Sequence, residues 1–303
     1  MNQGWVYHDY IHEGASGVTV LDYYTQRYQR FSEQDWRRRI CAGQVLLEGR
    51  PASIDTALEA GQHLAYHRPP WQEPEAPLWF EVLYEDADLL AIAKPIGLPI
   101  LPGGGYLDHT LLHLLRQRYP DETPVPVHRL GRGTSGIVLL ARSAVAKSEL
   151  SRQIRDRTVQ KIYRALIGPS NCSEPFTIEV PIGRIPHPFL GHIHSATPTG
   201  KYSRSDVRVL QHTTETTLVE VSILTGRPHQ IRIHLAAAGF PLLGDPLYGV
   251  GGTPNASVEG EMAVPGDCGY HLHAVDIGFT HPTTQKWMQV HCPAPRPLQR
   301  LCP

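Results

Sequence analysis

A cluster of prolines divides this chain into two parts. Pro69, Pro70, Pro74 and Pro77 lie within nine residues of one another, around Trp71. Proline fixes φ and has no backbone N–H, so this spacing disfavours a helix and favours a semi-rigid extended segment. The pattern of apolar residues also changes across it. We therefore expect a linker at 69–77 between a small N-terminal module, 1–68, and a larger domain, 78–303.

The length and composition fit two globular units. At about 150 residues per domain, 303 residues predict two domains. The chain is 41% hydrophobic and 19% charged, which excludes a disordered protein. Its 27 glycines and 27 prolines predict many turns and short strands. The five cysteines show no CxxC spacing, so we expect neither a disulfide framework nor a zinc site.

Nothing in the sequence indicates a membrane protein. The longest apolar runs, such as 137–141, are far too short to cross a bilayer. The first ten residues lack the basic and apolar regions of a signal peptide. We expect a soluble, cytoplasmic protein that functions as a monomer.

The N-terminal module has its own pattern. Ser32 can cap a short helix that contains Trp36 and Ile40, and Gly43 suits its C-terminal end. Residues 43–51 then predict a strand, a turn and a second strand. The helix carries three consecutive basic residues, which form either a solvated helix face or an RNA contact: Arg37, Arg38 and Arg39.

This arrangement resembles the small RNA-binding module named after ribosomal small-subunit protein four. In that module a helix ending in "I..G.V.VNG" presents basic residues to RNA. Ile40, Gly43, Val45 and Gly49 match this frame, and Glu48 replaces the commoner asparagine. The resemblance covers about fifty residues, and it implies that the three arginines bind RNA.

The larger domain carries a concentrated positive charge. Residues 127–164 contain nine basic side chains and only two acidic ones, Glu149 and Asp156, which gives a net charge of +7 within a chain of net charge −1. Binding of nucleic-acid phosphates requires such a strip, because each neutralised phosphate releases counterions. A helix with a basic outer face would give the same count.

Three segments of this domain combine unusual residues. Residues 126–142, PVHRLGRGTSGIVLLAR, join a glycine-broken turn to an apolar strand, which could simply be a tight loop before a core strand. Residues 159–166, VQKIYRAL, predict a strand. Residues 224–249, LTGRPHQIRIHLAAAGFPLLGDPLYG, place five polar or charged side chains in eight positions, which is costly unless they are exposed or hydrogen-bonded.

Together these segments resemble RluA-type pseudouridine synthases. That family carries "HRLDxxTSG", "KxYxAL" and "TGRxHQIRxH…GDxLYG" in this order. Residues 91–105, AIAKPIGLPILPGGG, and 272–282, LHAVDIGFTHP, match two further family segments. The resemblance, which covers about 78–300, implies an α+β fold with a mixed, largely antiparallel sheet and a central cleft. It also implies isomerisation of an extruded uridine to pseudouridine in structured RNA (rRNA or tRNA), without a metal or an organic cofactor.

One residue departs from the family's pattern at its most important position. The catalytic aspartate of "HRLD" is Gly131 here, and glycine offers neither a nucleophile nor a base. We expect the loop to keep its path and to leave a side-chain-sized void that faces Arg227. A carboxylate from elsewhere could replace the aspartate only within reach of the reacting ring, and three lie nearby in sequence: Asp108, Asp121 and Glu122.

The resemblance assigns roles to the remaining site residues. Tyr163 matches the tyrosine that packs on the target base and can act in proton transfer. Arg227 matches the arginine that pairs with the catalytic aspartate, and Arg129 the arginine that occupies the space left by the extruded uridine in some relatives. Further RNA contacts are expected from Arg132, Lys161 and Arg232.

Three functions are therefore open. The first is a pseudouridine synthase, and the second is a catalytically inactive relative that still binds RNA. The third is a metal-dependent hydrolase that uses clustered histidines. Those histidines lie in two groups and fit hydrogen-bonded loop residues better than metal ligands: His187, His192 and His194, and His271 and His273.

Overall fold

The computed structural model describes residues 1–28, 31–187, 190–255 and 263–300. The chain divides into two compact units. One comprises 1–73 with 186–193, and the other comprises 74–185 with 194–303. Within the described ranges, no helix is both long enough and apolar enough to cross a membrane.

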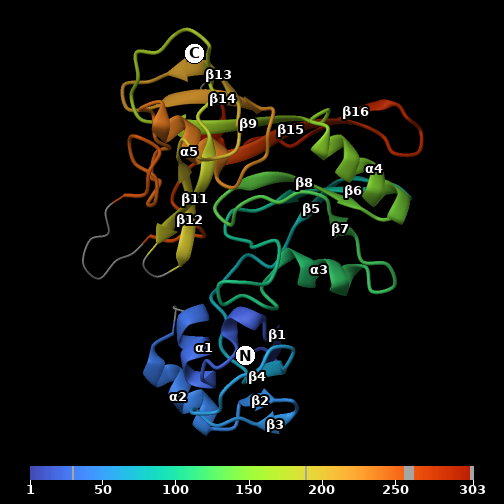
Figure 1. Cartoon of the computed structure of the whole chain (residues 1–303). Coiled ribbons are helices and arrows are strands. Elements are labelled where there is room, and N and C mark those ends of the chain that lie inside the picture. Colours follow the sequence, from blue (N-terminus) through green and yellow to red (C-terminus); the bar gives the residue numbers. More distant parts are fainter. Residues whose placement is uncertain (29–30, 188–189, 256–262, 301–303) are drawn as a thin grey trace. The chain divides into compact units, whose positions relative to one another are not determined.

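The smaller unit packs two helices on an antiparallel sheet with the strand order β1-β4-β2-β3 (Figure 1). Its core is aromatic: Trp36 stacks on Tyr24 at 4.5 Å between ring centroids, and Tyr66 meets Trp36 edge-on. Its elements are β1 (Trp5–Tyr10), η1 (Glu13–Ala15), α1 (Val20–Arg27), α2 (Glu33–Cys41), β2 (Val45–Leu47), β3 (Arg50–Pro51) and β4 (His63–Arg68).

The ends of α2 lie where the sequence predicts them. The hydroxyl of Ser32 accepts a hydrogen bond from the backbone N–H of Asp35, and the Asp35 carboxylate accepts one from the N–H of Ser32. This capping box satisfies N–H groups that the first helical turn leaves without partners. Gly43 follows the helix with φ +71°, a conformation that favours glycine. The turn between β2 and β3 has positive φ at Glu48 and Gly49.

The larger unit is built on one mixed sheet with the strand order β10-β13-β14-β9-β15-β8-β6-β5, in which β16 also pairs with β15 and β7 with β8. Only the β15–β8 pair is parallel among the pairings of this sheet in the described residues. The predicted α+β fold with a largely antiparallel sheet is confirmed. Figure 1 shows β13, β14, β9, β15, β8 and β6 following one another across the unit.

The elements of the larger unit are β5 (Glu81–Glu85), β6 (Leu89–Lys94), α3 (Leu111–Arg118), β7 (Val125–Pro126), β8 (Ser135–Ala141), α4 (Ala144–Arg155), β9 (Gln160–Ile167), β10 (Phe176–Ile178), β13 (Ser205–His212), β14 (Thr217–Ile223), α5 (Gln230–Ala237), β15 (Leu272–Thr280), β16 (Trp287–His291) and η2 (Arg296–Leu298). Two further strands, β11 (Ile182–His187) and β12 (Gly191–Ala196), form a sheet of their own.

Both faces of the central strands are buried, which explains their continuous apolar sequences. Along β8, Val138 and Leu140 belong to one core, whereas Ile137 and Leu139 belong to another on the opposite face. Helices α3 and α5 contribute to the first core and α4 to the second. A strand covered on both sides cannot alternate apolar and polar residues. The central strands β9, β15 and β8 thus lie buried beneath the loops that carry the site.

Candidate functional site

The three unusual segments meet at one cavity of about 90 Å³. Ligand pockets usually measure about 300–1,000 Å³, so this cavity has room for part of a nucleotide, such as its base, rather than the whole. Its lining comes from the loop before β8, from β9, from the β14–α5 loop with the start of α5, and from the start of β15: Arg129, Leu130, Gly131, Thr134, Tyr163, Ile223, Arg227, His229, Gln230, Ile231, Arg232, Tyr270 and Leu272.

Strand pairing brings these segments together. Ala274 of β15 lies opposite Tyr163 of β9 on one side and opposite Gly136 of β8 on the other. A Cβ at Gly136 would lie 2.2 Å from the carbonyl oxygen of Ala274, and its φ is +107°. Only glycine permits this approach. The third glycine of the first motif therefore positions the loop of Gly131 beside the strand that carries Tyr163.

The side chain of Tyr270 limits the space for a Cβ at Gly131. A Cβ on Gly131 would lie 3.2 Å from the hydroxyl oxygen of Tyr270 and 3.7 Å from that of Thr134. The Tyr270 ring also packs against Gly133, and its hydroxyl shares a 3.2 Å hydrogen bond with Thr134. Tyr270 therefore crowds the Cβ position of Gly131, although Gly131 and Arg227 still line one cavity, as the sequence predicts. The backbone of Gly131 does not have positive φ, so it can carry a side chain without backbone strain.

No carboxylate is among the cavity-lining residues of the described chain. Arg227 instead donates from Nε and Nη2 to the backbone carbonyl of Tyr202, at 3.2 Å each. The three acidic residues considered from the sequence, Asp108, Asp121 and Glu122, do not line the cavity. The guanidinium of Arg227 thus lies at the cavity with a neutral carbonyl as its partner.

Arg232, which lines the cavity, forms a buried ion pair with Asp245. Asp245 accepts two hydrogen bonds from Arg232, at 2.7 and 2.8 Å, and two more from the backbone N–H groups of Leu247 and Tyr248. The Arg232 side chain is 2% exposed. Its guanidinium stacks on the Tyr270 ring at 4.3 Å. Because every oxygen of Asp245 is engaged, this carboxylate holds Arg232 and Tyr270 in place and is not free to act on a substrate.

Tyr163 is buried, with 7% of its surface exposed. Burial raises the pKa of its hydroxyl far above the usual value, so the phenol stays protonated at neutral pH. A protonated phenol can stack on a base and donate a hydrogen bond, but it cannot accept a proton. The position of Tyr163 in the cavity fits the packing role that the resemblance implies.

The other predicted cations of this site differ in their partners. Arg132 donates to the Gly266 carbonyl at 2.7 Å and to the Tyr106 hydroxyl at 2.8 Å, so its guanidinium holds loops together. Arg129 is exposed at the cavity, and within the described residues it has no hydrogen bond or ion pair. Lys161 is likewise without a partner in that part of the chain, and burial lowers the pKa of its ammonium group. Arg129 and Lys161 are therefore the cations best placed to meet a phosphate.

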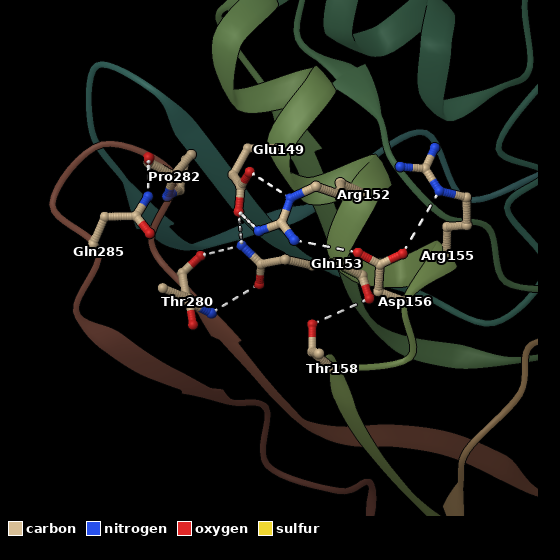
Figure 2. A network of polar contacts seen from close by, with 9 residues as sticks. All are labelled: Glu149, Arg152, Gln153, Arg155, Asp156, Thr158, Thr280, Pro282 and Gln285. Atoms are coloured by element: carbon tan, nitrogen blue, oxygen red, sulfur yellow. Dashed lines mark hydrogen bonds and ion pairs between the residues drawn. The ribbon is translucent and has the colours of Figure 1, made fainter.

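Much of the remaining positive strip is neutralised locally. Figure 2 shows Arg152 of α4 between Glu149 and Asp156, with Arg155 also directed at Asp156. The amide of Gln153 in the same network bonds both the carbonyl and the N–H of Thr280 in β15. Arg142 pairs with Glu85 at 2.9 Å. The net charge of +7 already includes Glu149 and Asp156, so of these pairs only the one with Glu85, which lies outside the strip, lowers the charge further.

The three arginines of α2 have different surroundings. Arg37 pairs with Glu33 at 3.0 Å and Arg38 pairs with Asp35, and both arginines are exposed. Arg39 lies over the rings of Phe31 and Trp36, at 3.8 and 4.8 Å from their centroids. An arginine placed over aromatic faces supports the core of its own unit.

The sequence did not identify three residues that shape the site: Tyr270, Tyr248 and Asp245. Asp245 and Tyr248 lie within the quoted segment GDPLYG, which is the signal that could have singled them out. Tyr270 comes just before the segment LHAVDIGFTHP, and its role depends on a contact across the sheet. No group of three or more His, Cys, Asp or Glu side chains that could hold a metal ion is found among the described residues.

Comparison with known proteins gives a consistent result. Residues 88–237 match the family model described as RNA pseudouridylate synthase. An uncharacterized RNA pseudouridine synthase of Synechocystis is 49% identical over 92% of this chain and 95% of its own length. Ribosomal large subunit pseudouridine synthase D of Neisseria meningitidis serogroup B is 33% identical over 90% of this chain and 74% of its own. The solved structure of human RNA pseudouridylate synthase domain containing 1 matches with a TM-score of 0.57 and 27% identity, covering 75% of this chain and 89% of that one.

Proposed function

The chain belongs to the family of RNA pseudouridine synthases, and on this premise we propose that it isomerises an extruded uridine of a structured RNA to pseudouridine. Uridine isomerisation breaks the bond between N1 of uracil and C1′ of ribose and forms a bond from C5 to C1′. The target base must leave its stack to reach a protein group. The cavity between the loop of Gly131, Tyr163 and Arg227 supports this proposal, because it has room for a base and opens beside unpaired cations.

The class of RNA is part of the proposal. The similarity to a protein named for the ribosomal large subunit favours rRNA, and tRNA is the other substrate that the sequence leaves open. Arg129 and Lys161 would bind phosphates next to the target nucleotide. We take the protein to act as a monomer. A reducing compartment such as the cytoplasm suits the four described cysteines, which are all unpaired.

A second function is favoured by one specific observation. The cavity lining holds no carboxylate within the described chain, and the Tyr270 hydroxyl crowds the Cβ position of Gly131. Removal of a catalytic nucleophile or base commonly costs many orders of magnitude in rate. A relative that binds RNA without isomerising uridine would be consistent with this site.

One experiment separates the two functions. Purified protein is incubated with unmodified transcripts of ribosomal RNA and with a mixture of unmodified tRNA transcripts, and pseudouridine is then measured in the digested RNA. Pseudouridine that depends on the wild-type protein, and that is reduced in the variants Tyr163→Ala and Arg227→Ala, supports the enzyme. Salt-dependent binding of either RNA without any pseudouridine supports the binding protein instead.

A further inference from the structure

His229 is the cavity-lining residue with the least usual backbone. It precedes α5 with φ +57° and ψ +20°, in the left-handed region that a residue with a side chain rarely adopts. Such a conformation costs free energy and persists only where surrounding contacts impose it. Here the amide of Gln230 accepts from the N–H of Arg227 and bonds Thr225, which fixes the turn that carries His229.

Hydrogen bonding determines which nitrogen of His229 carries the proton. Its Nδ1 lies 2.8 Å from the hydroxyl of Tyr248, and that hydroxyl donates its hydrogen to the carbonyl of His194, also at 2.8 Å. Burial raises the pKa of Tyr248 far above its usual value, so the hydroxyl keeps its hydrogen. A hydroxyl that has already donated can only accept, so Nδ1 must be the donor. Nε2 of the neutral ring is therefore an unprotonated acceptor.

No other residue of the cavity lining in the described chain offers an unprotonated base like Nε2 of His229. The three arginines are permanently charged, and Thr134 and Gln230 are not bases at neutral pH. Tyr163 and Tyr270 both have pKa values raised by burial and stay protonated. In the described cavity lining, His229 is thus the one side chain with a basic lone pair at neutral pH. His229 lines the cavity, its Nδ1 is held by Tyr248, and Nε2 has no hydrogen-bond partner among the described residues.

The reaction requires one proton to move. When N1–C1′ breaks, its electron pair stays on uracil, and the conjugated C5 then attacks C1′. The adduct is neutral, has an N1=C6 double bond, and carries both hydrogen and C1′ on C5. The C5–H bond must then break, its pair forming C5=C6 while the N1=C6 pair moves to N1, which finally takes up a proton. The product therefore needs a base that accepts the proton from C5 and a donor that protonates N1.

We propose that Nε2 of His229 is that base, an inference that rests on the proposed function. Nε2 accepts the C5 proton, the ring becomes imidazolium, and the proton then passes to N1, so the residue ends the cycle neutral. No external donor or acceptor is needed. The adduct is a strong carbon acid because its deprotonation restores the conjugated ring, so a weakly basic imidazole is sufficient.

The charges around His229 make this step depend on bound RNA. Burial, followed by the field of nearby cations, lowers the pKa of His229 to about 3 in the free protein. The charged and titratable groups that face it are Arg232, His194, Asp245, Arg129 and Tyr248. Phosphates bound beside Arg129 would offset part of the positive field and raise the imidazole pKa toward neutrality. The ring would then be neutral before the reaction and better able to hold the proton during it.

The test compares wild type with His229→Asn, because asparagine tolerates the left-handed backbone and is not a base. The substrate is the same transcripts with tritium at C5 of uridine, so tritium release reports the C5–H step. We expect unchanged RNA affinity and a loss of about 100-fold or more in the rate, the usual contribution of a general base. His212→Asn, in an exposed strand position of β13, is the matched control and should keep the wild-type rate.

A second variant, His229→Gly, tests the same role in case asparagine disturbs the loop. His229→Gly suits φ +57° and leaves room for imidazole, so added imidazole should restore tritium release in this variant and not in Tyr163→Ala. An active wild type whose His229→Asn variant keeps its rate would overturn the role of His229 and leave the proposed function intact. So would an inactive His229→Gly variant that binds RNA but does not respond to imidazole. A wild type that releases no tritium from either RNA contradicts the proposed function itself, and with it this base.

Discussion

At the residue scale, the contact between Gly131 and Tyr270 determines whether this site can hold a carboxylate. The Tyr270 hydroxyl lies 3.2 Å from where a Cβ at Gly131 would be, which is tighter than ordinary van der Waals contact. Tyr270 is also fixed by Thr134 and by the stacked Arg232, so it cannot easily move away. The two positions are therefore energetically coupled.

Gly131→Asp should lower the free energy of unfolding by about 1–3 kcal/mol through overpacking. Adding Tyr270→Phe should recover part of that loss, because it removes the atom that the new Cβ meets, although it also gives up a hydrogen bond to Thr134. Chemical denaturation of the wild type, both single variants and the double variant measures this coupling. Additive effects of the two substitutions would contradict the crowding seen at Gly131.

The same variants test the chemistry. If the wild type makes no pseudouridine, the double variant should gain some, since its carboxylate enters a cavity that contains Arg227. If the wild type is active without a carboxylate, the added side chain should reduce the rate by obstructing the base. The amount of pseudouridine in digested transcripts distinguishes these outcomes, and Gly131→Asn is the matched neutral control.

At the element scale, His128 joins the loop of the first motif to β8. Its Nε2 accepts a hydrogen bond from the backbone N–H of Leu139 at 3.0 Å, so the ring must be neutral in the folded protein. Burial, with a smaller effect from Lys161, lowers the pKa of His128 to about 4. This loop is therefore attached to its strand through a group that titrates at acidic pH.

This attachment should make the protein less stable as the pH falls from about 6.5 to 4. In that window the unfolded chain binds a proton at His128 that the folded chain excludes, so the free energy of unfolding falls by up to about 1.4 kcal/mol per pH unit. Above pH 6.5 His128 is neutral in both the folded and the unfolded chain, so its contribution to the pH dependence disappears. His128→Gln, whose side-chain oxygen can still accept from Leu139, should have a smaller slope in this window. Urea denaturation at several pH values checks it, and an unchanged slope would count against the neutral His128.

At the scale of the whole molecule, the arrangement of charges matters more than their number. The net charge is −1, and several cations of the strip 127–164 are paired with carboxylates of their own neighbourhood. Arg129 and Lys161 form no ion pair with a carboxylate in the described residues, and the same holds for Lys147, Arg157 and Arg164. Arg129 lines the cavity and Lys161 lies on β9 near Tyr163, so we expect these two to bind the RNA phosphates closest to the site.

Arg129→Ala and Lys161→Ala should each weaken RNA binding and lower the slope of log K against log salt by about 0.7–0.9, the value expected for one lost phosphate contact. Arg152→Ala is the matched control: it removes the same kind of charge from an ion-paired network, so the slope should change much less (Figure 2). Binding titrations of one rRNA transcript at several salt concentrations provide the comparison. Equal effects of all three variants would show that the strip binds RNA through its total charge.

The local elements of this chain follow from its sequence alone. The helix capped by Ser32, its end near Gly43 and the strand within 159–166 all lie where nearby residues predict them. The motif order also identifies the family, because it depends only on residue types and spacing. The local elements depend on interactions within a few residues. The family can be identified because its motifs are compared with those of other sequences, which requires no structure.

The state of the site was decided by tertiary structure. Sequence predicted an empty space between Gly131 and Arg227, and a cavity lies there, but only the tertiary structure shows that Tyr270, distant along the chain, crowds the Cβ position of Gly131. Sequence could not tell which arginines are paired: Arg232, expected to contact RNA, is buried against Asp245, and Arg152 lies between two carboxylates. Close packing places side chains far apart in sequence within 3 Å of each other, and at that distance the partner determines whether a group is charged, occupied or available.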